Sequence, residues 1–207
     1  MQTTAPGFER RDLELLDELD DGFATVRHRA GANLACAEGC SDCCIGPFPV
    51  TRLDVQRLRR AMLDADETVA QLTRSDARRA LDTMREGFPG DIDSGRLNDD
   101  KAALDAFFEK HADLVCPVLD TKTGSCRLYA ARPISCRTYG PPIAFERQPA
   151  PHCTLCFREA SSAEIETCRW SPDPADREQA LLRELGVPAG EDWAMLIAHA
   201  VTTEDDA

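Results

Sequence analysis

The nine residues Cys36-Ala37-Glu38-Gly39-Cys40-Ser41-Asp42-Cys43-Cys44 contain four cysteines. The spacing Cys40-x-x-Cys43 lets both sulfurs of a tight loop face one metal ion, while the backbone N–H groups between them hydrogen-bond to sulfur. Cys36 adds a third thiol upstream, and Cys44 follows Cys43 directly. Because neighbouring residues point in different directions, Cys43 and Cys44 could serve two metals, or one could support the site from outside the ligand set. The stretch predicts a metal-binding loop.

Six more cysteines follow this loop. Cys153-Thr154-Leu155-Cys156 repeats the two-residue spacing, whereas Cys116, Cys126 and Cys136 have nine residues between neighbours and need a fold to bring them together. The candidate metal ligands are therefore Cys36, Cys40, Cys43, Cys44, Cys116, Cys126, Cys136, Cys153 and Cys156. Cys168 is either a distant ligand or a buried free thiol. Spacing alone does not divide the ten thiols between one site and two.

Composition limits the partners of this 207-residue chain. Residues 1–11 lead into an acidic helix without the apolar core of a signal peptide, so we expect a cytoplasmic protein whose thiols stay reduced. Ten cysteines in that setting favour metal over the alternative, disulfides. No run approaches the ~18–20 apolar residues of a membrane span. A net charge of −13 argues against general nucleic-acid binding. The expected partner is a metal ion, with neither nucleic acid nor membrane.

Apolar periodicity predicts helices on both sides of an aperiodic, cysteine-rich centre. The predicted helices cover 8–28, a helix from an N-cap at Thr51 through Met62, another helical stretch to about 86, 99–112, a short helix from Arg132, and two tail helices. Of the tail helices, one begins at Asp173 and one carries the stripe Trp193–Val201. Cys116–Tyr139 opens with a hairpin around residues 120–125. We expect a mostly α fold: a small irregular helical domain with a cysteine-rich metal centre, one short β-hairpin and accessory N- and C-terminal helices. The predicted organisation is an acidic helix (1–33), a metal-binding domain (34–171) and a helical extension (172–207), in one structural unit.

Basic residues accompany the second group of cysteines. Residues 121–147 carry five bases and one acid, in a chain that is strongly acidic overall. Arg132 precedes the turn-setting Pro133, and Arg137 follows Cys136. Guanidinium groups close to thiolates would offset their charge and lower thiol pKa values. We therefore expect Arg132 and Arg137 to surround the ligands, the alternative being a coincidental basic loop.

Other residue types add little chemistry. His152 adjoins Cys153 and is a candidate imidazole ligand, while His28, His111 and His199 lie in predicted helices and are expected to be structural. Nothing isolates a catalytic Cys/His pair among ten thiols, and there is no Gly-rich phosphate loop. The sequence leaves open whether the protein is an enzyme.

Two motifs resemble the YkgJ-type cysteine-cluster family of zinc- or iron-chelating domains. The first is Cys36-x3-Cys40-x2-Cys43-Cys44 with Gly46-Pro47 and Val50-Thr51-x2-Asp54; the second is Cys116-Pro117-Val118-Leu119, Gly124-x-Cys126-x-Leu128-Tyr129 and Arg132-Pro133-x2-Cys136-Arg137-x-Tyr139. The resemblance covers about residues 34–140 and implies a small, mostly helical, metal- or Fe–S-binding domain. It is firmest for Cys40, Cys43, Cys44, Cys116, Cys126 and Cys136. It is looser for Cys36, whose spacing is x3 instead of x2, and Cys153, Cys156 and Cys168 extend the usual set. Flagellin N-methylases contain a similar cluster, and that activity is not carried over.

Three functional hypotheses follow. The first is a metal-binding protein that holds an Fe–S cluster or iron, alternatively zinc, and takes part in redox chemistry or electron transfer. The second is a structural zinc module that presents an acidic helical surface to a protein partner. The third is storage or delivery of the metal.

Overall fold

The computed structural model describes residues 6–144, 152–189 and 193–202. About 51% of the described residues are helical, in eight α-helices and three short 3₁₀ helices, and the strands are short and few. This confirms the predicted mostly α fold with a short hairpin. None of the described helices is long and apolar enough to cross a membrane.

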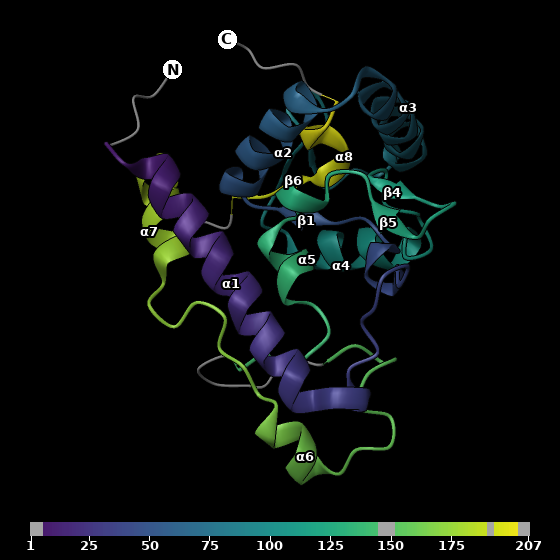
Figure 1. The fold of residues 1–207 in the computed structure, drawn as a ribbon. Coiled ribbons are helices and arrows are strands. Elements are labelled where there is room, and N and C mark those ends of the chain that lie inside the picture. Colours follow the sequence, from purple (N-terminus) through teal and green to yellow (C-terminus); the bar gives the residue numbers. More distant parts are fainter. Residues whose placement is uncertain (1–5, 145–151, 190–192, 203–207) are drawn as a thin grey trace.

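The longest helix, α1 (Phe8–Ala30), runs along one side of the molecule (Figure 1). Leu16, Leu19 and Val26 form its buried stripe, as the periodicity predicts. The helix packs against α5 (Ile134–Thr138) and α7 (Arg177–Glu184). The long helix α1 therefore contacts both the short helix α5 and the C-terminal helix α7.

Caps explain where the next three helices begin. Thr51 Oγ1 accepts from the Asp54 backbone N–H and starts α2 (Arg52–Asp64), confirming the predicted cap. Asp66 caps α3 (Glu67–Met84) in the same way. Asp100 accepts from two backbone N–H groups at the start of α4 (Lys101–Lys110).

An antiparallel sheet with strand order β1-β6-β3-β2 lies between the helices. Its strands are β1 (Pro49–Val50), β2 (Gly90–Asp91), β3 (Arg96–Leu97) and β6 (Met195–Leu196). The expectation of a helix from Trp193 through Val201 is wrong at its start, since β6 is a strand and α8 covers only Ile197–Ala200. Met195 pairs with both Val50 and Arg96, and these distant strands supply backbone partners that favour strand over helix.

The predicted hairpin is present as β4 (Leu119–Asp120) paired with β5 (Ser125–Cys126). A 3₁₀ turn, η3 (Tyr129–Ala131), connects it to α5. Further along, α6 (Ser162–Thr167) begins with a capping box formed by Ser161 and Glu164. The helix predicted from Asp173 begins instead at Arg177, after Asp176, which adopts a left-handed conformation.

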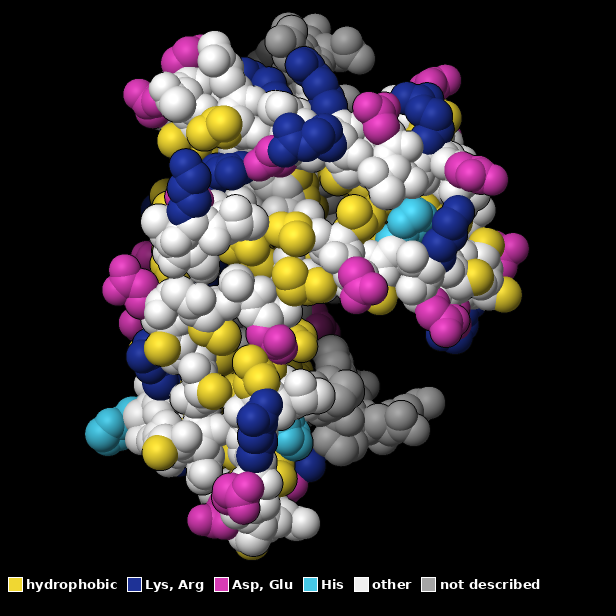
Figure 2. All heavy atoms as spheres, turned by 90° about the vertical axis from the view of Figure 1, so that its right-hand side faces the viewer, with side chains coloured by type: hydrophobic (Ala, Val, Ile, Leu, Met, Phe, Trp, Pro, Cys, Tyr) yellow, Lys and Arg dark blue, Asp and Glu magenta, His cyan; other side chains and the backbone are white. Residues whose placement is uncertain are grey.

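Three hydrophobic cores fill the molecule. The first lies around the four-stranded sheet and includes Leu58, Val118 and Leu196. The second joins the first half of α1 to α7. The third is small and packs residues 153–170 against the end of α1. Figure 2 shows the part of the molecule that contains α6 as a narrower extension below the rest. The cysteines lie in and between the first and third cores.

Candidate metal centre

A short backbone pairing brings Cys44 beside Cys116. Ile45 forms an antiparallel bridge with Val115, and the Cys116 N–H donates to the Cys44 carbonyl at 2.8 Å. Cys126 lies in β5 directly opposite Leu119, three residues after Cys116. The hairpin thus unites three thiols that are far apart in the sequence.

Asp54 fixes the position of α5, which carries Cys136. Its carboxylate is 2% exposed and accepts from the Ile134 backbone N–H at 3.2 Å, at the first residue of α5. Arg57 donates to the same carboxylate at 2.8 Å. Asp54 therefore connects the beginning of α2 to the short helix that holds a candidate ligand.

Two glycines let the first cysteine loop approach the hairpin. A Cβ atom on Gly124 would lie 2.5 Å from the Gly39 carbonyl oxygen, which is too close for any side chain. Gly124 also has φ +71°, a left-handed conformation that favours glycine. The loop 36–44 and the hairpin turn are thus in backbone contact.

Five thiols interact electrostatically with one another: Cys43, Cys44, Cys116, Cys126 and Cys136, the five-thiol group. A hydrogen bond from the Cys44 thiol lowers the pKa of Cys43 to about 7, helped by the Cys43 backbone amide and the charge of Arg132. The same hydrogen bond, together with burial, raises the pKa of Cys44. Cys43 is thus prepared to become a thiolate near neutral pH.

The other members of the five-thiol group are harder to ionise. Burial is the largest cause that raises the pKa of Cys116 and of Cys136 to about 12, and it also raises the pKa of Cys126. Neighbouring sulfurs add to the effect on each. A bound cation removes this cost, because a coordinating thiol is deprotonated outright. Mutual repulsion among buried sulfurs is what a metal ion relieves.

The two arginines lie differently around the five-thiol group. The charge of Arg132 lowers the pKa of both Cys43 and Cys126, and its guanidinium stacks 3.8 Å from the centre of the Tyr129 ring. Arg137 is buried and donates to Asp20 on α1 at 2.6 Å and to the Arg132 carbonyl at 3.0 Å. Arg132 therefore acts on the thiols by its charge, whereas Arg137 holds the Arg132 backbone in place.

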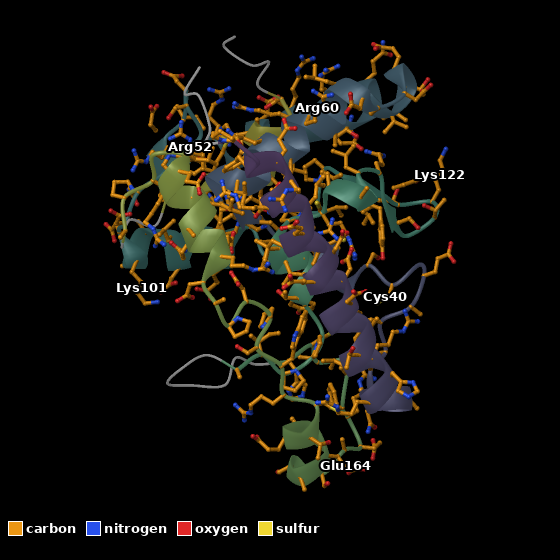
Figure 3. All side chains as sticks on the ribbon, turned by 60° about the vertical axis from the view of Figure 1, so that its left-hand side comes forward. Cys40, Arg52, Arg60, Lys101, Lys122 and Glu164 are labelled. Atoms are coloured by element: carbon orange, nitrogen blue, oxygen red, sulfur yellow. The ribbon has the colours of Figure 1, made fainter. Side chains whose placement is uncertain are left out.

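Four other thiols form a second set: Cys36, Cys40, Cys153 and Cys156, the four-thiol group. Burial and the hydrogen-bonded Cys156 raise the pKa of Cys36 to about 12, with further contributions from the charges of Cys40 and Cys153. Cys153 and Cys156 are buried in the third core, and Cys36 packs against it. Figure 3 shows Cys40 between Glu164 of α6 and Lys122 of the hairpin turn.

Cys40 and Cys43 differ in the thiols with which they interact, although their spacing suggests one shared ion. Cys40 interacts with Cys36, whereas Cys43 interacts with the thiols of the hairpin and α5. Cys168 is buried in the third core, and the nearby His152 packs edge-on against the Phe157 ring at 5.4 Å. The other histidines differ in exposure: His28 is exposed, while His111 and His199 are buried.

Two further residues lie beside the thiols: Asp42, which the sequence did not single out, and Tyr139, whose place in the second cysteine motif already predicts a position around the site. Asp42 lies inside the first cysteine loop, and its carboxylate accepts from the Cys153 thiol at 3.5 Å. The pKa of Tyr139 is raised by burial and by the charges of Cys153, Asp42 and Cys43. Asp42 and Tyr139 therefore lie between the two thiol groups. The only available signal for Asp42 was its place between two cysteines.

A half-open cavity of about 920 Å³ adjoins α5 on its other side. Its lining includes Asp54, Ser135, Tyr139, Glu178 and Trp193. Burial, and then the charge of Asp54, raises the pKa of Glu178 to about 7. Glu178 therefore keeps a proton to an unusually high pH in this acidic cavity.

The donor chemistry of both groups fits a thiolate-bound metal. Thiolates suit zinc, iron and Fe–S clusters, and all ten cysteines are free. Within the described parts of the chain, no group of three or more Cys, His, Asp or Glu side chains could hold a metal ion as it stands. Binding would therefore require the thiols to turn from their present positions.

Comparison with known proteins identifies the family of this chain. The sequence model of the CxxCxxCC family, described as "Putative zinc- or iron-chelating domain", matches residues 35–169. Searches of curated proteins and of solved structures give no match. The matched range includes every cysteine of the five-thiol and four-thiol groups and more than half of the chain. The chain therefore belongs to the CxxCxxCC family of zinc- or iron-chelating domains.

Proposed function

We propose that the five-thiol group is a metal centre that keeps one zinc ion, iron ion or Fe–S cluster in place within the fold. The observation that carries this proposal is that five thiols from three separate segments, the loop 36–44, the hairpin and α5, lie close enough to influence one another's pKa values. Sulfurs that repel one another when ionised gain most from a shared cation.

Four thiolates complete either a tetrahedral zinc site or an Fe–S cluster. We assign the ligand roles to Cys43, Cys116, Cys126 and Cys136. Cys44 remains protonated and donates a hydrogen bond to the Cys43 sulfur. In this assignment Cys44 supports the ligand Cys43 by a hydrogen bond, so the metal needs only four coordination positions.

The first consequence of such a centre is structural. Each ligand-bearing segment is short, since the hairpin strands have two residues each and α5 has five. Small elements of this kind cannot bury enough apolar surface alone, and binding free energy becomes folding free energy where the site does not exist in the unfolded chain. The metal would hold these segments together. When bound, the group supplies positive charge that keeps the thiolates ionised.

An electron-transfer role is the second candidate, and one observation favours it. Arg132 places a positive charge beside the sulfurs, and hydrogen bonds and charges around a cluster set its reduction potential. Under this alternative the same ligands hold an Fe–S cluster, and Arg132 raises its potential.

Metal analysis with an absorption spectrum of anaerobically purified protein separates these alternatives. Iron and sulfide with broad visible absorption support the cluster, whereas colourless protein with tightly held zinc supports the structural site. Fast exchange of the metal with weak chelators would favour delivery and would contradict retention.

Variants test the ligand assignment. Cys43→Ser is expected to lose the metal, whereas Cys44→Ser keeps it, because serine at position 44 still offers a hydroxyl donor to the Cys43 sulfur. Equal metal loss in both variants would contradict the assigned roles. Unchanged metal content in Cys43→Ser and Cys136→Ser would reject the centre.

A further inference from the structure

We propose that the four-thiol group, Cys36, Cys40, Cys153 and Cys156, is a second and separate metal site. The site would bind a divalent ion that accepts four thiolate ligands, such as zinc or iron(II). The inference rests on the proposed function in one respect, that this chain binds metal through thiolates. It adds a second ion and assigns the two cysteines of Cys40-x-x-Cys43 to different ions.

The first support is the separation of the thiols between cores. Cys153 and Cys156 are buried in the third core, with Cys36 packed against them. Cys116 is buried in the first core, with Cys44 and Cys126 packed against it. Sulfurs bound to one ion at ~2.3 Å lie within about 4 Å of each other in a tetrahedral site. Because the two sets of thiols pack into different cores, we assign them to different ions.

The second support is the shape of the Cys153–Cys156 turn. The Leu155 backbone N–H points at the Cys153 sulfur at 3.4 Å, and the Cys156 N–H donates to the Cys153 carbonyl at 2.9 Å. Backbone N–H groups directed at sulfur are typical of Cys-x-x-Cys loops that bind metal, because they stabilise the thiolate charge.

The residue after this turn is in a costly conformation. Phe157 is buried and has φ +56°, in the left-handed region that bulky residues avoid. Its N–H donates to the Asn33 carbonyl, just beyond α1, at 2.7 Å. Strain of this kind persists only where the surroundings enforce it, and it is concentrated at functional sites. Here it turns the Cys153–Cys156 loop toward the end of α1, where Cys36 lies.

Gly140 makes room for the meeting of these segments. Its carbonyl accepts from the Cys153 N–H at 3.1 Å, and a Cβ atom at this position would lie 2.8 Å from the Cys36 sulfur. The carbonyl of Gly140 thus binds the backbone of Cys153, and the absence of a side chain on Gly140 leaves space for the Cys36 sulfur. An ion bound there would fasten the extension containing α6 to the end of α1.

Cobalt(II) titration of the metal-free, full-length protein tests the proposal, since thiolate ligands give cobalt strong charge-transfer absorption. We expect saturation at two equivalents for the wild type. Cys156→Ser and Cys40→Ser are expected to saturate at one equivalent, and Cys136→Ser also at one. Cys168→Ser is the matched control, because it removes a buried thiol of the same core, and it keeps two. Circular dichroism checks that each variant is folded, and the exposed Cys40 gives a variant that changes no buried group.

Amide hydrogen exchange locates the second ion. Cobalt is expected to slow exchange in residues 152–170 in the wild type and in Cys136→Ser, but not in Cys156→Ser. Saturation of the wild type at one equivalent, or loss of the same single equivalent in both Cys136→Ser and Cys156→Ser, would overturn the second site and leave one shared centre. Two equivalents in Cys136→Ser would instead reject the five-thiol centre, so the two proposals fail separately.

Discussion

Replacing Arg132 by alanine tests whether positive charge beside the sulfurs supports metal binding. The charge of Arg132 lowers the pKa of Cys43, which is about 7 in the metal-free protein, and also that of Cys126. The Arg132 side chain is 23% exposed and stacks on Tyr129, so its charge is partly shielded from solvent. In the variant the pKa of Cys43 rises, and protons compete better with the metal for this sulfur.

The expected loss of metal affinity follows from how much Arg132 contributes to the lowered pKa of Cys43. The hydrogen bond from Cys44 lowers the pKa of Cys43 more than Arg132 does. We therefore expect the lower end of the range for residues that support ligands, about a tenfold loss of metal affinity or ~1.4 kcal/mol at neutral pH. The loss grows below pH 7, where Cys43 is protonated in both proteins. It shrinks well above pH 7, where Cys43 is ionised in both. Lysine at this position restores the charge but not the planar stacking on Tyr129, so rescue is partial.

Arg137→Ala tests the other arginine, which acts on the site through the structure around Arg132. Arg137 is 5% exposed and bonds with Asp20 and with the Arg132 carbonyl. Since Asp20 is half exposed, we expect the lower end of the cost of breaking a buried pair, about 3 kcal/mol of folding free energy. That corresponds to a melting temperature lower by roughly 6–12 °C. Chelator competition at several pH values, with thermal melting, measures both effects. Overlapping chelator curves for wild type and Arg132→Ala would refute the electrostatic argument.

Three further predictions concern the surroundings of the thiols. Asp54→Ala removes the acceptor at the start of α5, so we expect at least ~3 kcal/mol less folding free energy in urea and faster labelling of Cys136 by a thiol reagent; unchanged labelling would contradict this role. Glu178→Gln removes a group whose pKa is raised to about 7, from an ordinary value of 4.5. Because the folded state keeps this proton longer than the unfolded state, wild-type stability falls relative to the variant between about pH 4.5 and 7, by at most ~3 kcal/mol; parallel stability curves from pH 4 to 8 would exclude it. Gly124→Ala places a Cβ 2.5 Å from a backbone oxygen, whereas Gly87→Ala has a similar positive φ and nothing within 4 Å. Thermal melting should show a larger loss for Gly124→Ala, and equal losses would show that the contact with Gly39 is unimportant.

Local signals in the sequence were sufficient for the main helices and the hairpin. The stripe Leu16, Leu19 and Val26 predicts α1, and the Thr51–Asp54 cap predicts the start of α2. Both signals act within a few residues, so no distant partner is needed to recognise them. The turn chemistry around Gly124 predicts the β4–β5 hairpin for the same reason.

Longer-range pairing explains the errors. Leu196 belongs to an apolar stripe of helical period that begins at Trp193, yet it forms β6 together with Met195, because strands β1 and β3, about 145 and 100 residues earlier, offer backbone partners. Burial of these residues agrees with either structure, so the hydrophobic pattern did not distinguish the two. The unexpected start of α7 at Arg177 has a local cause instead, the left-handed conformation of Asp176.

The sequence by itself determined which atoms are available for metal binding: ten thiols, with short spacings at Cys40–Cys43 and Cys153–Cys156 and arginines close by. Only the tertiary structure decided how they are grouped, with Cys40 toward Cys36 and the third core, and Cys43 toward the hairpin and α5. The physical reason is that a short spacing permits two sulfurs to face one point but does not compel them to do so. The direction of a thiol also depends on backbone hydrogen bonds near it, such as those from the Cys116 N–H to the Cys44 carbonyl and from the Phe157 N–H to the Asn33 carbonyl, whose partners are 72 and 124 positions apart in the sequence.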